Sequence, residues 1–151
     1  MMKSFNKNRK KRKNKTRRLN TKNNNYSQQN IVTTFLQMLN TVKLYHWKTS
    51  SYAQHKATDE LYTNLNLNID NFIEIMLGKT GGRVNLTGKK TLPLLDYTNV
   101  TDFIKEINRY KHFLNNMNNS GLSVTNNSDL FNVRDEILGN LNQFTYLLTF
   151  K

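Results

Sequence analysis

The chain has 151 residues, no cysteine and a formal net charge of +13, from 23 lysines and arginines against 10 acids. This length suits one domain with a single core, and the lack of thiols excludes both a disulfide scaffold and a thiolate metal site. No apolar run approaches the roughly twenty residues of a membrane span, and the charged start does not resemble a signal peptide, so we expect a protein that is neither membrane-bound nor exported.

The positive charge is concentrated in the first 25 residues, which hold eleven basic residues and no acid. Because this segment lacks the apolar residues needed for a core, we expect residues 1–26 to form a disordered basic tail. Dense positive charge binds phosphates with little regard to sequence, so nucleic acid, first of all DNA, is the favoured partner. The residues expected to bind it are Lys3, Lys7, Arg9, Lys10, Lys11, Arg12, Lys13, Lys15, Arg17, Arg18 and Lys22.

Three other interpretations of this tail stay open. The basic runs at residues 10–13 and 15–18 also suit a nuclear localisation signal. The tail could instead act as a solubilising arm. Attachment to an acidic membrane is less favoured, because only Phe5 and Leu19 could anchor the segment in an interface.

Two amphipathic helices are predicted in the first half of the remaining chain, at residues 27–47 and 52–77, from apolar residues that recur every three to four positions. Gly78 is predicted to end the second helix. Residues 80–93 contain three glycines and the only proline, which predicts a long crossover loop.

Two further helices are predicted at residues 100–118 and 129–149, with residues 126–128 as the cap region of the last one. No strand pattern is found. Four helices with one long connection in the middle predict an all-α fold, a four-helix bundle over residues 27–151 with a crossover between the second and third helices.

The second predicted helix carries side chains that bind hard metals. His55 with Asp59, and Asp70 with Glu74, are each four residues apart, so the members of each pair point the same way. With His55 at zero on a helical wheel, Asp59 lies at about 40°, Asp70 at about 60° and Glu74 at about 100°, which makes one polar edge. Imidazoles and carboxylates suit iron, manganese or zinc. The apolar stripe lies elsewhere on the wheel and consists of Leu61, Leu65, Ile69, Phe72 and Met76.

The two pairs lie about 22 Å apart along the helix, too far for one metal ion. If the same helix of a second subunit lies antiparallel across a two-fold axis, His55 and Asp59 of one chain meet Asp70 and Glu74 of the other. This arrangement would form two equivalent sites. The alternative is that these acids form an ordinary solvated helix surface.

Residues 44–78, with the sequence LYHWKTSSYAQHKATDELYTNLNLNIDNFIEIMLG, carry a family resemblance. They resemble the first two helices of the Dps branch of the ferritin-like superfamily, the mini-ferritins that protect DNA in starved cells. In that family a His-Trp pair is followed by an aromatic residue, a His, an Asp four residues later, an Asp eleven further on and a Glu four beyond. His55, Asp59, Asp70 and Glu74 keep those intervals. His46 departs from the pattern, because it precedes His55 by nine residues where the family has twelve.

The resemblance implies a ferritin-like bundle with a ferroxidase site shared between two-fold-related subunits. Iron(II) would be bound by His46, His55 and Asp59 of one chain and by Asp70 and Glu74 of its mate, and oxidised by peroxide or oxygen. It further implies a hollow, dodecameric shell that stores the oxidised iron, a lysine-rich arm on DNA, and a cytoplasmic or nucleoid-associated location.

A rival interpretation is a non-catalytic ferritin-like protein that packages DNA or builds a virion. Such a protein would be encoded by a large DNA virus and located in the virion or the host nucleus, with the metal-binding residues serving only as an ion-pair cluster. The short first turn and the heavily charged tail favour this rival. A basic ribosomal or RNA-binding protein would explain the tail but not the site. His112, Asp135 and Glu136 are interpreted as packing or surface residues.

Overall fold

The computed structural model describes residues 26–119 and 126–150, and all regular secondary structure in these residues is helical. The elements are α1 (Gln28–Lys48), α2 (Tyr52–Thr80), α3 (Val100–Asn116), the short 3-10 turn η2 (Met117–Asn119) and α4 (Ser128–Leu147). The prediction of an all-α chain with four helices is confirmed for this part of the chain. Residues 1–25 of the predicted basic tail, with all eleven of its expected nucleic-acid-binding residues, lie outside the described residues.

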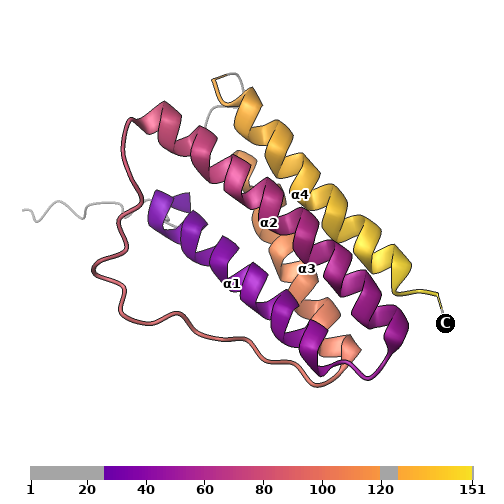
Figure 1. Ribbon diagram of the computed structural model, residues 1–151. Helices are drawn as coiled ribbons and strands as arrows, with labels where there is room; N and C mark the ends of the chain where they lie inside the picture. The colour runs from indigo at the N-terminus through magenta and orange to yellow at the C-terminus, as the bar shows by residue number, and fades with distance from the viewer. Residues whose placement is uncertain (1–25, 120–125, 151) are drawn as a thin grey trace, which may run out of the picture.

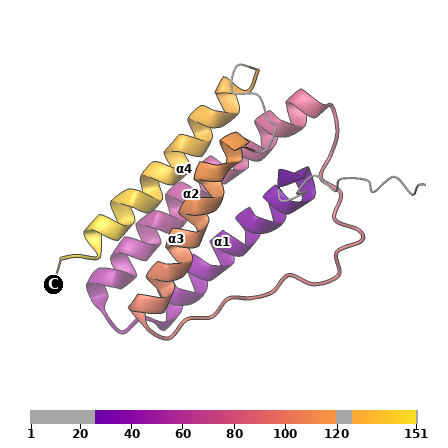
Figure 2. The ribbon, with the colours of Figure 1, turned by 180° about the vertical axis from the view of Figure 1, so that it is seen from behind.

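The helices pack side by side as a bundle (Figures 1 and 2). α1 and α2 are antiparallel and joined by a short turn. A long connection, residues 81–99, then returns along the outside of α1, so that α3 starts at the same end of the bundle as α2. α4 runs antiparallel to α3. Among the described residues, every helix is too short or too polar to span a membrane.

Three of the four helices begin with a side-chain cap. Ser27, Ser51 and Asn99 accept hydrogen bonds from backbone N–H groups three residues further on, at 3.3, 3.4 and 2.9 Å. These bonds satisfy N–H groups that have no partner inside a helix. The helices therefore begin within one residue of the positions that the sequence pattern predicts.

The predicted end of the second helix is wrong. α2 continues through Gly78 to Thr80 and ends at Gly81, whose φ of 68° is left-handed. In this last turn the Thr80 hydroxyl donates to the Met76 carbonyl, at 3.0 Å, and Lys79 forms an ion pair with Asp129 on α4. Gly81 then provides the left-handed conformation that other residues adopt at a cost.

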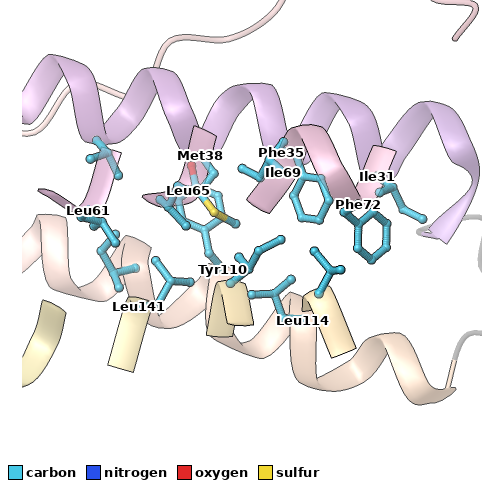
Figure 3. Close-up of a cluster of buried hydrophobic side chains, with 14 of the residues drawn as sticks. Ile31, Phe35, Met38, Leu61, Leu65, Ile69, Phe72, Tyr110, Leu114 and Leu141 are labelled. Carbon is cyan, nitrogen blue, oxygen red and sulfur yellow. The ribbon is translucent and has the colours of Figure 1, made fainter. Parts of the chain in front are cut away.

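The core lies between all four helices and is apolar and aromatic (Figure 3). The predicted stripe of α2 is buried along its whole length. Tyr45 of α1 stacks on Phe103 of α3, with ring centroids 4.0 Å apart. Deeper in the bundle, the hydroxyl groups of Thr41 and Tyr110 share a hydrogen bond of 2.9 Å, and burial raises the pKa of Tyr110.

Candidate metal site at the turn between α1 and α2

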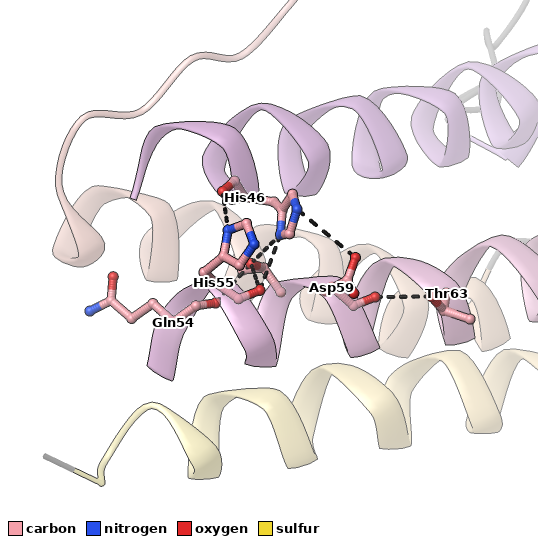
Figure 4. Close-up of polar contacts among 6 residues, drawn as sticks. His46, Gln54, His55, Asp59 and Thr63 are labelled. Atoms are coloured by element: carbon pink, nitrogen blue, oxygen red, sulfur yellow. Dashed lines mark hydrogen bonds and ion pairs between the residues drawn. The ribbon is translucent and has the colours of Figure 1, made fainter. Parts of the chain in front are cut away.

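The turn between α1 and α2 brings two histidines into contact (Figure 4). His46 lies in the last turn of α1 and is only 7% exposed, and His55 lies in the first turn of α2. Their rings are stacked with centroids 3.9 Å apart and an interplanar angle of 23°. The turn that is three residues shorter than the Dps pattern therefore still places His46 beside His55.

Reciprocal hydrogen bonds orient both rings. His46 Nδ1 lies 3.1 Å from the His55 carbonyl oxygen, and His55 Nδ1 lies 3.1 Å from the His46 carbonyl oxygen. A carbonyl oxygen only accepts, so each Nδ1 carries the hydrogen and donates it. In the neutral form of each ring, Nε2 then holds the lone pair that a metal needs. The buried Thr58 hydroxyl, 3.2 Å from His46 Nδ1, packs against the same edge of that ring.

Asp59 lies next to the histidine pair, on the Nε2 side of His46, and we call these three residues the trio. Its Oδ1 lies 3.9 Å from His46 Nε2, which is too far for a hydrogen bond. Bonds from nitrogen or oxygen to a metal such as zinc are about 2.0–2.2 Å long, so one ion between the two atoms could span up to about 4.2 Å. The Asp59 side chain is 53% exposed, so this edge of the trio is open to solvent and to further ligands.

A complete metal site is not formed by the part of one chain that the structure describes. Within it, no group of three or more His, Asp or Glu side chains is arranged to hold an ion. Asp70 and Glu74 are exposed on α2, and Asp70 is eleven residues beyond Asp59, or about 16 Å along the helix. Both acids keep the polar edge that the helical wheel predicts, but they do not reach the trio. Their meeting with it across a two-fold axis stays a prediction.

Large apolar side chains are exposed next to this edge. Trp47, Tyr52 and Leu67 are 69%, 78% and 68% exposed. On the wheel that places His55 at zero, Tyr52 falls at about 60° and Leu67 at about 120°, within or beside the acidic edge. Lys43 Nζ lies 4.6 Å from the centre of the Tyr62 ring and 5.8 Å from that of Trp47, so it joins α1 to α2 on this flank.

The residues that the sequence set aside as surface groups are exposed. His112 lies on α3, where its Nε2 is 2.6 Å from the Asn116 side chain. Asp135 and Glu136 are exposed on α4. Thr58 was not predicted to lie at this site. A polar residue on the core side of α2, one turn after His55, is the feature of the sequence that could have indicated it.

Comparison with known proteins gives one family. The model of a family of unknown function, DUF5856, matches residues 46–148, which include all five predicted metal ligands. No curated protein and no solved structure matches the chain.

Proposed function

The chain belongs to DUF5856, and because that family has no known function, we propose one from the geometry of the site: a Dps-like ferroxidase of the ferritin-like superfamily. It would bind iron(II) between subunits and hold nucleic acid through its basic N-terminal arm. The observation that carries the proposal is the group of His46, His55 and Asp59 at one end of an α2 edge that also presents Asp70 and Glu74.

The helix order supports the proposal. An antiparallel α1 and α2, a long crossover, and an antiparallel α3 and α4 are the arrangement of ferritin-like bundles. The usual in-bundle di-iron site needs a Glu-x-x-His motif on two helices, and no such motif occurs in the sequence. Iron chemistry in this chain would therefore use the outer edge of α2 and not the bundle interior.

A two-fold axis near the middle of α2 would join the two half-sites. The midpoint between the His55–Asp59 pair and the Asp70–Glu74 pair lies at about residues 64–65, so an antiparallel copy of α2 centred there brings each pair onto the other. The exposed Tyr52 and Leu67 offer apolar surface to such a copy. Three carboxylates would then face one another, and their repulsion would be relieved by a cation between them.

The residues have separate roles toward the iron substrate. The Nε2 atoms of the two histidines would bind iron(II), and the reciprocal Nδ1 hydrogen bonds support this by leaving Nε2 of each ring unprotonated. The carboxylates of Asp59, Asp70 and Glu74 stabilise the additional charge of iron(III) and so favour oxidation. Each iron(II) loses one electron, and a peroxide molecule takes two electrons and two protons to give two waters.

The test is iron(II) oxidation by the purified protein after addition of peroxide or oxygen, followed in the near ultraviolet. We expect the wild type to oxidise iron(II) much faster than protein-free buffer and the double variant Asp70→Ala/Glu74→Ala to match the buffer. The matched control is Glu60→Ala/Glu136→Ala, which also removes two exposed carboxylates but lies off the edge, and it should keep the wild-type rate. If all three proteins match the buffer, the site is an ion-pair cluster, and the non-catalytic packaging protein is the better description.

A further inference from the structure

A groove of about 640 Å³ lies between the first half of α1, α3 and the crossover, away from the candidate metal site. We call it the basic groove and define it by the cations Lys89, Lys105 and Arg109 and by the aromatic pair Tyr26 and Phe113. Its other lining residues are threonines, asparagines and His112, and none of the residues that line it is acidic. Every charged side chain that lines the groove is therefore basic.

The exposed side chains of Lys89 and Lys105 can turn toward a ligand in the basic groove, and Arg109 can reach one while it stays paired. Lys105 pairs with Asp102 at 2.8 Å and Arg109 with Glu106 at 2.9 Å, but the two basic side chains are 71% and 74% exposed. The Lys105–Asp102 pair is exposed on both sides and contributes little, about 0–1 kcal/mol, so it competes weakly with a phosphate. Glu106 is buried, so Arg109 keeps this partner. Arg109 also has further N–H donors beyond the one that Glu106 accepts.

The aromatic pair links the groove to the basic tail. Tyr26 stacks on Phe113 with ring centroids 5.0 Å apart, and its hydroxyl donates to the Phe113 carbonyl at 3.0 Å. Tyr26 immediately follows the 25 residues that carry eleven basic side chains. The tail is therefore attached to the body at the wall of the basic groove, and a polyanion held by the tail is brought next to it.

We propose that the basic groove binds the phosphodiester backbone of nucleic acid and so extends onto the folded body the contact that the tail makes. This inference rests on the nucleic-acid arm of the proposed function. Cations bind the phosphates, amide and hydroxyl groups suit phosphate and sugar oxygens, and an aromatic surface suits an unstacked base. The volume suits a nucleotide-sized part of a strand and not a whole duplex.

The experiment measures binding of the full chain to a single-stranded oligonucleotide of about thirty nucleotides over a range of salt concentrations. The groove variant is Lys89→Gln/Lys105→Gln/Arg109→Gln. The control variant is Lys48→Gln/Lys56→Gln/Lys79→Gln, which also removes three charges. Lys48 and Lys79, like Lys105, form ion pairs with exposed acids, and Lys56, like Lys89, is exposed.

Each phosphate contact contributes about 0.7 to the slope of log affinity against log salt for a single strand. We expect the groove variant to lower that slope by about 2 and to bind at least about tenfold more weakly at 0.1 M salt, with a much smaller change in the control. Circular dichroism of the groove variant should show the helical content of the wild type, so that weaker binding is not due to misfolding. The single variant Arg109→Lys keeps the charge and should bind like the wild type.

Three results would overturn the inference. The first is an equal loss in the groove and control variants, which would mean that only net charge matters. The second is a groove variant that loses binding to vesicles of anionic lipid but keeps its affinity for the oligonucleotide. The third is a wild type that binds no oligonucleotide, which also removes the nucleic-acid arm of the proposed function. The iron oxidation assay is independent of all three, so failure of the groove and failure of the ferroxidase are distinguishable.

Discussion

Mixing two inactive variants tests whether the iron site is shared between subunits. One variant, His55→Ala/Asp59→Ala, loses the half-site at the start of α2. The other, Asp70→Ala/Glu74→Ala, loses the half-site further along the same helix. Asp59 and Asp70 are about 16 Å apart along α2, so neither half can assist the other within one chain. Each variant alone should therefore oxidise iron(II) no faster than buffer.

A dimer of one variant with the other has one site that is intact and one that has lost both halves. The intact site takes His55 and Asp59 from the second variant and Asp70 and Glu74 from the first. After equal mixing and exchange, half of the dimers are mixed, and half of their sites are complete, so about a quarter of the wild-type rate should return. A site formed within one chain predicts no recovery at any mixing ratio.

The assay co-refolds the two variants with different affinity tags and measures iron(II) oxidation beside the amount of doubly tagged dimer. A mixture of wild type with the variant that lacks all four residues is the control for exchange. Its rate per wild-type chain should fall by about half, because every mixed dimer loses both sites. Abundant mixed dimer without recovered oxidation would refute the shared site, whereas the absence of any dimer would refute the two-fold arrangement itself.

Three further predictions follow from single positions. Because the chain has no cysteine, Asn66→Cys, near the proposed axis, should form an intermolecular disulfide on mild oxidation, seen on a non-reducing gel, whereas Asn132→Cys on α4 should not. Burial raises the pKa of Tyr110, so the stabilisation that its neutral hydroxyl provides is complete below pH 10 and is lost as the pH rises further. In denaturant titrations, the free energy of unfolding of Tyr110→Phe should therefore fall less from pH 9 to 11 than that of the wild type. The difference should be up to about 1.4 kcal/mol per pH unit. Gly78→Ala should raise the free energy of unfolding by about 0.5–1 kcal/mol, because Gly78 lies inside α2, and Gly81→Ala should lower it by about 1 kcal/mol, because φ is positive there. Thermal melts in which both variants shift the melting temperature in the same direction would contradict the observed end of α2.

Periodicity alone predicted much of this fold, and α2 shows why. Leu61, Leu65 and Phe72 are spaced so that only a helix places them on one side, and all three are buried. The same calculation placed Asp59 and Asp70 on an exposed edge, as observed. The helical wheel predicts both sets correctly because, in a regular helix, the spacing of residues determines the direction of their side chains independently of the neighbouring helices.

Features that depend on contacts between helices could not be predicted in this way. Gly78 and Gly81 are both plausible helix ends in the sequence, and spacing alone does not show that Gly81 is the residue with the left-handed conformation. Glu106 is buried and accepts a hydrogen bond from Tyr97, although its spacing alone does not separate it from a solvent-facing acid. The basic groove likewise combines residues that are distant in the sequence.

The position of the His46 ring likewise depends on a contact between helices. The turn is shorter than in the Dps pattern, and the structure places the His46 ring directly on that of His55. Sequence spacing could not show this, because the turn conformation and the two backbone hydrogen bonds determine where the ring lies.

The crossover has a consequence for how the chain can vary in length. It lies along α1, where Gln29 donates to the carbonyl of Asn85 and Gln37 to that of Pro93. All five predicted ligands precede it in the sequence. An insertion into its exposed stretch would therefore leave every ligand in register, and doubling the length of a flexible loop costs only about 0.6 kcal/mol. Relatives could carry crossovers of quite different lengths around an unchanged pair of first helices.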